Sequence, residues 1–311
     1  MLNVKSILVP IDTRERNAEP VVNWAALLAR TLGSRLILLQ VTEGEESRHE
    51  YEQVARTELA RLVNQYCMGV TADPLVLVGR TPAVILGTIE STACDLVVMG
   101  THARPWHQRL LLGSTAEAVL RTSTVPASTV PVLIVRNTAP VQSPPQLTQL
   151  LFPTDFSAAS AAGEEWTWTL ASHDVKEIVL VHVIENPLLE VYEPDKAEFD
   201  LQRLMEESRQ HPPRSAKPYW DHAYRVAQDK LNHLRQQLLS APAHGSQVEI
   251  QVSEGPAAES ILKLAGEKAP DMLVMATHGR TGVRRLMLGS VTEKILRTAV
   301  WPLLTVPSRD G

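Results

Sequence analysis

The sequence repeats itself once, and this duplication constrains the fold more than any other feature. Five short runs rich in Val, Ile and Leu occur in the same order in each half. The matching pairs are 7–12 (ILVPID) with 150–155 (LLFPTD), 35–41 (RLILLQV) with 177–183 (EIVLVHV), 75–79 (LVLVG) with 250–255 (IQVSEG), 95–102 (DLVVMGTH) with 271–278 (DMLVMATH), and 131–135 (PVLIV) with 302–306 (PLLTV). Self-similarity on this scale indicates a doubled domain.

Helix-like segments separate the apolar runs, as in 19–33 (EPVVNWAALLARTLG) and 226–240 (VAQDKLNHLRQQLLS). Strands that alternate with helices favour right-handed crossovers and a parallel sheet with helices on both faces. We therefore expect an α/β protein of two tandem Rossmann-like domains, at 1–138 and 148–311. The polar segment 137–146 (NTAPVQSPPQ) contains three prolines and is the expected linker between them.

The two halves differ in length chiefly at one place. Val41 and Gly79 lie 38 positions apart, whereas the matching Val183 and Gly255 lie 72 positions apart. The extra segment, at about 186–222, is charged and interrupted by prolines. A surface helix with a loop is the interpretation we favour, and a lid or a partner-docking arm beside a site is the alternative.

Composition excludes several classes of protein. A net charge of −5 over 311 residues predicts no nucleic-acid partner. No apolar run approaches about 18 residues, so no membrane partner is expected either. Cys67 and Cys94 form neither a metal spacing nor a disulfide framework. The first residues lack the apolar core of a secretory signal, and a cytoplasmic location is the expectation.

A glycine-containing loop is expected before the last helix of each half. In the second half this loop is 277–290 (THGRTGVRRLMLGS). Ser290 and Glu293 form an S-x-x-E capping box, and Ser114 and Glu117 form the same pattern in the first half. Because free backbone N–H groups and the helix dipole favour an anion at a helix start, the pattern points to a phosphate site.

Other loop residues fit a phosphate site. Gly279, Gly282 and Gly289 would let the backbone approach a ligand closely, and Arg280 with two further arginines would supply cations. A plain helix start beneath a solvated loop is the alternative, and it stays open at this point. The loop is neither a P-loop nor a Rossmann fingerprint, because G-x-x-x-x-G-K-[ST] is absent and no G-x-G-x-x-G follows the first strand.

Asp12 and Asp155 stand at the end of the first strand in each half. In open α/β sheets ligands bind in the crevice where the strand order reverses, beside the first and fourth strands. Each aspartate and the glycine loop of the same half would therefore flank one crevice. A turn or helix cap is the alternative role for each aspartate, and the two roles can coexist.

These residues resemble the universal stress protein family in its tandem two-domain form, over nearly all of both halves. The specific part of the likeness is the family's nucleotide motif, G-x-x-G, nine residues, then G-[ST]. The four motif positions are held by Ala276, Gly279, Gly289 and Ser290 in the second half, and by Gly100, Ala103, Gly113 and Ser114 in the first.

The resemblance implies ATP as the cofactor, with Mg²⁺ as an optional companion, bound in a HUP-type (adenine nucleotide alpha hydrolase-like) domain of sheet order 3-2-1-4-5. It implies adenosine beside the aspartate and the residue after strand two, and phosphates on the glycine loop and the last helix. The implied nucleotide-binding residues are Pro153, Thr154, Asp155, Val183, Ala276, Thr277, Gly279, Arg280, Gly289, Ser290, Val291 and Thr292. The weaker first-half candidates are Pro10, Asp12, Val41, Gly100, Gly113, Ser114 and Thr115.

The first-half loop departs further from the motif than the second. Ala103 replaces a motif glycine and costs roughly 1–2 kcal/mol if that position needs a positive φ. Pro105 removes an N–H donor, and the bulk of Trp106 could fill the phosphate space. In the second half, Ala276 is a milder change. We expect the nucleotide chiefly in the C-terminal half.

Family members pair through the fifth strand, so 131–135 and 302–306 are expected to join the halves as an internal pseudo-dimer. A homodimer and an unidentified protein partner are further expectations. His102 and His278 occupy matching positions, but no second ligand follows at metal spacing, so no metal site is expected.

Three functions compete at this stage. An ATP-binding stress-response regulator is the favoured one, with no catalytic residue and at most slow ATP hydrolysis. A nucleotide-free scaffold for protein–protein contacts is the alternative. A nucleotidyl transferase or hydrolase ranks last, because neither an S-G-G-x-D-S loop nor an H-I-G-H turn is present.

Overall fold

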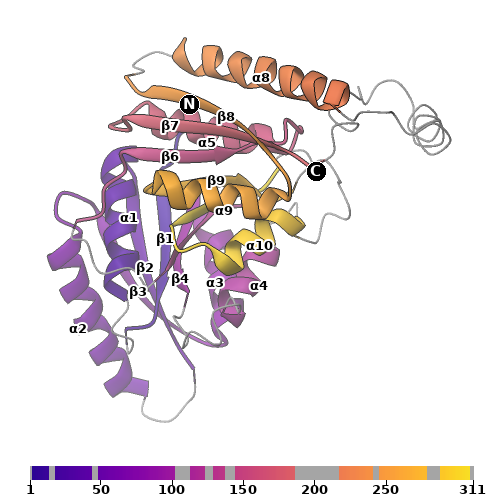
Figure 1. The fold of residues 1–311 in the computed structure, drawn as a ribbon. Helices are drawn as coiled ribbons and strands as arrows, with labels where there is room; N and C mark the ends of the chain where they lie inside the picture. The colour runs from indigo at the N-terminus through magenta and orange to yellow at the C-terminus, as the bar shows by residue number, and fades with distance from the viewer. Residues whose placement is uncertain are drawn as a thin grey trace.

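The computed structural model describes residues 2–13, 18–43, 48–101, 113–122, 129–136, 144–185, 217–240, 245–278 and 288–308. Over these residues the chain forms two α/β halves in tandem, as the repeat predicts (Figure 1). The first half comprises β1 (Ser6–Ile11), α1 (Ala18–Leu32), β2 (Arg35–Thr42), α2 (Arg48–Tyr66), β3 (Ala72–Val78), α3 (Thr81–Thr92), β4 (Leu96–Thr101), α4 (Ser114–Thr122) and β5 (Val132–Arg136). The second comprises β6 (Gln149–Pro153), α5 (Ser160–Ala171), β7 (Glu177–Ile184), α8 (Lys217–Leu239), β8 (Gln247–Glu254), α9 (Ala257–Lys268), β9 (Met272–Ala276), α10 (Ser290–Thr298) and β10 (Leu303–Val306).

The described strands form one ten-stranded sheet in the order β3-β2-β1-β4-β5-β10-β9-β6-β7-β8. Each half therefore has the expected order 3-2-1-4-5, and the two fifth strands meet at the centre. Neighbouring strands are parallel except β5 and β10, which pair antiparallel. Because this pair reverses the direction, the carboxyl ends of the two sets of strands lie at opposite edges of the common sheet.

Helices cover both faces of the sheet, and this is why the strands are almost continuously apolar. All six residues of β1 are buried, as are seven of the eight in β7. One core lies beneath α1, α2, α5 and α8, and a second lies beneath α3, α4, α9 and α10. Figure 1 shows α2 at the lower left and α8 at the top of the molecule, and each packs on the outer strands of its own half.

In each half, an aspartate directly before strand four binds the backbone at the start of strand one. The Asp95 Oδ2 atom accepts hydrogen bonds from the backbone N–H groups of Lys5 (2.8 Å) and Ser6 (3.0 Å). Asp271 Oδ2 does the same for Thr148 (2.6 Å) and Gln149 (2.9 Å). These bonds join segments about 90 and 122 residues apart and fix where each central pair of strands begins.

The extra segment expected at about 186–222 falls largely outside the described residues. Its last part, from Lys217, forms the first turns of α8, which packs on β7 and β8. The interpretation of the extra segment itself stays a prediction. Within the described residues, no helix combines the length and the apolar character needed to cross a membrane.

Candidate functional site

Three helices, α5, α9 and α10, begin at the carboxyl edge of the second half's sheet, where a ligand crevice is expected. A helix start presents N–H groups that have no partner within the helix. The chain itself, water or a ligand supplies acceptors for them. The three helix starts can therefore be compared by the acceptors that the chain itself places at each of them.

The start of α5 is occupied by Asp155. Its Oδ1 atom accepts hydrogen bonds from the Ser157 backbone N–H (3.0 Å), the Ser157 hydroxyl (2.6 Å) and the Ser160 hydroxyl (2.5 Å). The turn role considered for Asp155 is thus confirmed. The carboxylate is also held in a fixed orientation beside the end of β6.

The start of α9 is occupied by Glu185, the residue after β7. Its carboxylate accepts the Ala257 N–H at 2.8 Å. The first half repeats this device, since Glu43 after β2 accepts both the N–H and the hydroxyl of Thr81 at 2.7 Å. A carboxylate at a helix start complements the positive end of the helix dipole.

The start of α10 is different. The Gly289 N–H donates to the Thr277 carbonyl (2.7 Å), and the Glu293 N–H donates to the Gly289 carbonyl (2.8 Å). The intervening N–H groups, those of Ser290, Val291 and Thr292, have no hydrogen-bond acceptor among the described residues. Of the three helix starts, α10 is the one where no carboxylate of the described residues accepts a hydrogen bond.

The end of β9 fixes this helix start. The Thr292 hydroxyl donates to the Ala276 carbonyl at 2.8 Å, and Thr277 anchors its own N–H on the Val306 carbonyl at 2.9 Å. Thr277 and Thr292 are both buried, with exposed fractions of 1% and 4%. The first turn of α10 is thereby locked to the two strands beneath it.

The capping boxes expected from the sequence are wrong in both halves. Gly289 is the N-cap of α10, with φ −59° and ψ 142°, and no side chain caps the helix. Ser290 is therefore already inside the helix, one position too late to cap it. Glu293 pairs instead with Arg297 at 2.8 Å, one turn on. In the first half, Glu117 N–H donates to Gly113 and its carboxylate pairs with Arg121.

The structure brings most of the predicted second-half residues to one edge. Pro153 ends β6 and is followed by Thr154 and Asp155, and Val183 is the next-to-last residue of β7. Ala276 ends β9 and is followed by Thr277, and α10 begins at Ser290. These three strands are neighbours in the sheet. Gly279 and Arg280 lie outside the described residues.

The first-half candidates gather in the same way at the opposite edge. Pro10 lies in β1 and Asp12 directly follows it, Val41 lies in β2, Gly100 lies in β4, and Gly113 to Thr115 begin α4. Ala103, Pro105, Trp106 and His102 lie outside the described residues. The expected damage to this loop therefore stays a prediction.

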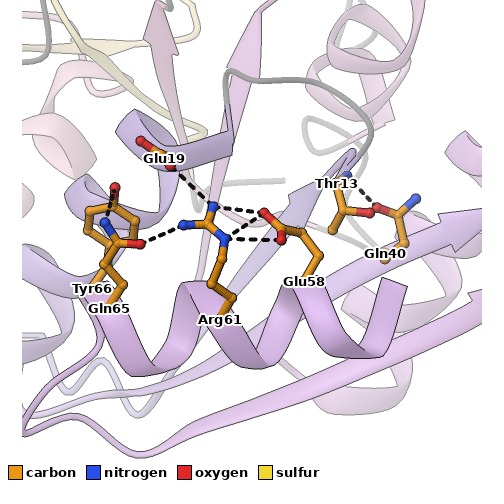
Figure 2. Close-up of polar contacts among 7 residues, drawn as sticks. All are labelled: Thr13, Glu19, Gln40, Glu58, Arg61, Gln65 and Tyr66. Atoms are coloured by element: carbon orange, nitrogen blue, oxygen red, sulfur yellow. Dashed lines mark hydrogen bonds and ion pairs between the residues drawn. The ribbon is translucent and has the colours of Figure 1, made fainter. Parts of the chain in front are cut away.

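Two buried polar residues were missed by the sequence reasoning. Gln40 and His182 occupy the same position in β2 and β7, with exposed fractions of 3% and 2%. Gln40 Oε1 accepts the Thr13 N–H at 2.7 Å (Figure 2), and His182 Nδ1 lies 2.7 Å from the Thr154 carbonyl. Each holds the segment that follows strand one of its half. A polar residue repeated inside an apolar strand was the available signal.

Phe156 adds a further element beside Asp155. Its ring stacks on His182, with centroids 4.5 Å apart, and the Lys230 ammonium lies 5.4 Å from the ring centroid. The residue has φ 60°, a left-handed conformation that side chains rarely adopt. This stack ties the segment after β6 to α8.

Two buried thiols and one histidine are the other titratable groups considered. Burial raises the pKa of the Cys67 thiol to about 11 and that of Cys94 to about 12, so both stay protonated at neutral pH. His278 Nδ1 lies 2.9 Å from the Thr277 hydroxyl. The described residues contain no group of three side chains that could hold a metal ion.

Comparison with known proteins gives a consistent picture. The model of the universal stress protein family matches twice, at residues 3–136 and 147–307. Universal stress protein MJ0577 of Methanocaldococcus jannaschii is 23% identical over 166 residues, which cover 52% of this chain and 96% of that protein. Universal stress protein A homolog 2 of Coxiella burnetii is 29% identical over 132 residues, or 39% of this chain and 90% of that one. The crystal structure of a universal stress protein from Archaeoglobus fulgidus aligns over 98% of this chain and 97% of its own, with a TM-score of 0.62 and 18% identity, which shows a shared fold.

Proposed function

Because the chain belongs to the universal stress protein family, we propose that it binds ATP in its C-terminal half and acts as a stress-response regulator. The observation that carries this proposal is the start of α10, where the amides of Ser290, Val291 and Thr292 have no acceptor among the described residues. The neighbouring helix starts, those of α5 and α9, hold carboxylates of the chain itself.

The phosphates belong on these amides and on the Ser290 hydroxyl, where the helix dipole adds attraction for negative charge. Gly289 and Arg280 complete this part of the site. The adenosine belongs beside Asp155 and Val183, between the ends of β6 and β7. The three helix-start amides together form an anion cradle of the kind that binds phosphate in other α/β proteins.

Slow turnover or none is part of the proposal. The carboxylates nearest the crevice, Asp155 and Glu185, already accept hydrogen bonds from the chain. These contacts give both carboxylates a role in the fold, and no other side chain among the described residues of the crevice stands out as a general base. We assign no protein ligand to Mg²⁺, and a bound ion would be held by phosphate oxygens and water. A regulator of this kind would act on a protein partner in the cytoplasm.

We place the domains at 1–138 and 148–311, and we propose that the N-terminal site is weak or empty. The substitutions at Ala103, Pro105 and Trp106 support this ranking. The geometry of the described residues does not separate the two halves, because the Glu43 cap and the α4 start in the first half mirror Glu185 and α10. Pairing of two chains is a separate proposal.

Titration calorimetry with ATP on three variants tests the proposal. Gly289→Asp and Ser290→Asp should abolish binding, because a carboxylate would occupy the amides and repel phosphate. Gly289→Asp should still fold, since φ −59° suits any residue and Asp is a favourable N-cap. The matched variant Gly113→Asp should retain about one site per chain. Equal binding in both halves would contradict the C-terminal preference, and no uptake by the wild type would favour the nucleotide-free scaffold.

A further inference from the structure

Arg136 is the last residue of β5, where the first half meets the second. In the antiparallel β5–β10 pair, Leu303 lies opposite Ile134 and Thr305 lies opposite Val132. Continuing this register by two residues puts Arg136 opposite Trp301, in the short connection between α10 and β10. The strand pairing therefore carries an arginine of the first half to the end of a helix of the second.

The Arg136 guanidinium donates a hydrogen bond from Nη2 to the carbonyl of Leu296, in the last turn of α10. The last four carbonyls of a helix have no partner within the helix, and Leu296 carries one of them. Its neighbour Ile295 accepts the Ala299 N–H at 2.7 Å. Arg136 thus donates to a carbonyl that has no donor within the helix. It also places a positive charge at the negative end of the helix dipole.

Burial of Arg136 strengthens this contact. The side chain is partly buried, and loss of hydration lowers the pKa of its guanidinium from the ordinary value. An arginine nevertheless remains charged at neutral pH. A charge–dipole contact screened from water is worth more than one on the open surface.

The contact with Arg136 completes the support of α10. At its start, Gly289 and Thr292 bind the carbonyls of Thr277 and Ala276 on β9. At its end, Arg136 binds the carbonyl of Leu296, whose side chain is 1% exposed in the core below. The start of α10 is therefore held by the end of β9, and its last turn is held by Arg136 of the first half. Both contacts fix the position of the Ser290, Val291 and Thr292 amides.

The second half has a different residue at the position equivalent to Arg136. In the repeat, 131–135 matches 302–306, so the residue equivalent to Arg136 is Pro307. Proline carries neither a guanidinium nor a backbone N–H, and the second half cannot return the same contact from Pro307. Arg136 belongs to the first half, and it contacts α10, the helix to which the phosphates are assigned.

We propose that Arg136 of the N-terminal half is a positioning residue for the anion site of the C-terminal half. It holds α10 where the amides of Ser290, Val291 and Thr292 meet the phosphates, and this assignment rests on the proposed function. The first half then contributes to nucleotide binding in the second whatever the state of its own loop. The tandem arrangement becomes a requirement of the site.

Calorimetric titration of the full chain with ATP tests this at a temperature well below the melting transition. Arg136→Gln should weaken ATP binding roughly three- to tenfold, the range expected for a residue that acts on a site through a packed element. Arg136→Lys should recover part of the loss, because it keeps a charged donor. Arg121→Gln is the matched control, since it removes the same charge from the last turn of α4 and should leave ATP affinity unchanged.

Hydrogen exchange on the ATP-free variants gives the second readout. Arg136→Gln should accelerate exchange of the α10 amides while those of α4 keep their rate. Unchanged exchange in α10, or a lowered melting temperature with an unchanged ATP affinity, would overturn the positioning role. If the wild type takes up no ATP, the proposed function fails, whereas α10 exchange still decides whether Arg136 holds the helix.

Discussion

Glu164, a partly buried residue of α5, shows how burial at a single residue makes stability depend on pH. Burial raises the pKa of its carboxyl, because the charged form loses hydration. The folded protein therefore binds this proton more tightly than the unfolded chain does. For a carboxyl with a raised folded pKa, stability falls as the pH rises through that pKa.

Glu164→Gln should accordingly raise the melting temperature at pH 7, since glutamine keeps the shape and removes the buried charge. The gain should shrink as the pH is lowered towards about 4, near the pKa of the unfolded carboxyl. Thermal melts across this pH range measure the effect, with the exposed Glu90→Gln as a control for simple loss of charge. A lower melting temperature for Glu164→Gln at pH 7 would mean that the ionised carboxylate stabilises the fold.

Single residues were only partly predictable from the sequence. The edge of the sheet at which Asp155 and Ser290 lie followed from the strand order, because carboxyl ends of parallel strands share one edge. The capping boxes failed because α10 begins one residue earlier than the S-x-x-E pattern suggests, at a glycine N-cap. Gln40 and His182 were missed because their partners lie 27 and 28 residues away, beyond any local pattern.

At the scale of elements, the clearest repeated feature is an aspartate before strand four that accepts hydrogen bonds from the start of strand one. Asp271 accepts three hydrogen bonds from Thr148 and Gln149, including one from the Thr148 hydroxyl at 2.9 Å. Asp95 accepts two in the first half. The aspartates were visible in the sequence as DLVVM and DMLVM, but their partners emerge only when the strands pair.

Asp271→Ala should destabilise the protein by about 1–3 kcal/mol, because it leaves polar groups of two partly buried residues without an acceptor. Asp271→Asn should cost less, since the amide oxygen can still accept. Urea denaturation measures both, and Asp95→Ala provides the matched change in the other half. Its loss should be smaller, because Asp95 has one described donor fewer and a more exposed contact with Lys5. Equal stability of Asp271→Ala and the wild type would show that these hydrogen bonds do not stabilise the fold.

At the scale of the whole molecule, duplication explains both the ten-stranded sheet and the antiparallel β5–β10 pair that joins its halves. The order 3-2-1-4-5 and the meeting of the fifth strands were expected from family resemblance, and both are confirmed. The contact of Arg136 with Leu296 could not be predicted, because it depends on the antiparallel register and on a departure from the internal repeat. The candidate residues of the two halves lie at opposite edges of the common sheet, with the β5–β10 pair between them.

The central claim is that the amides at the start of α10 are the phosphate site, and backbone NMR during an ATP titration tests it most directly. The amide resonances of Ser290, Val291 and Thr292 should shift strongly and saturate together, while the matching amides of Ser114 to Ala116 shift little. Strong saturating shifts confined to the first-half amides, or none at α10 while ATP binds elsewhere, would contradict the account.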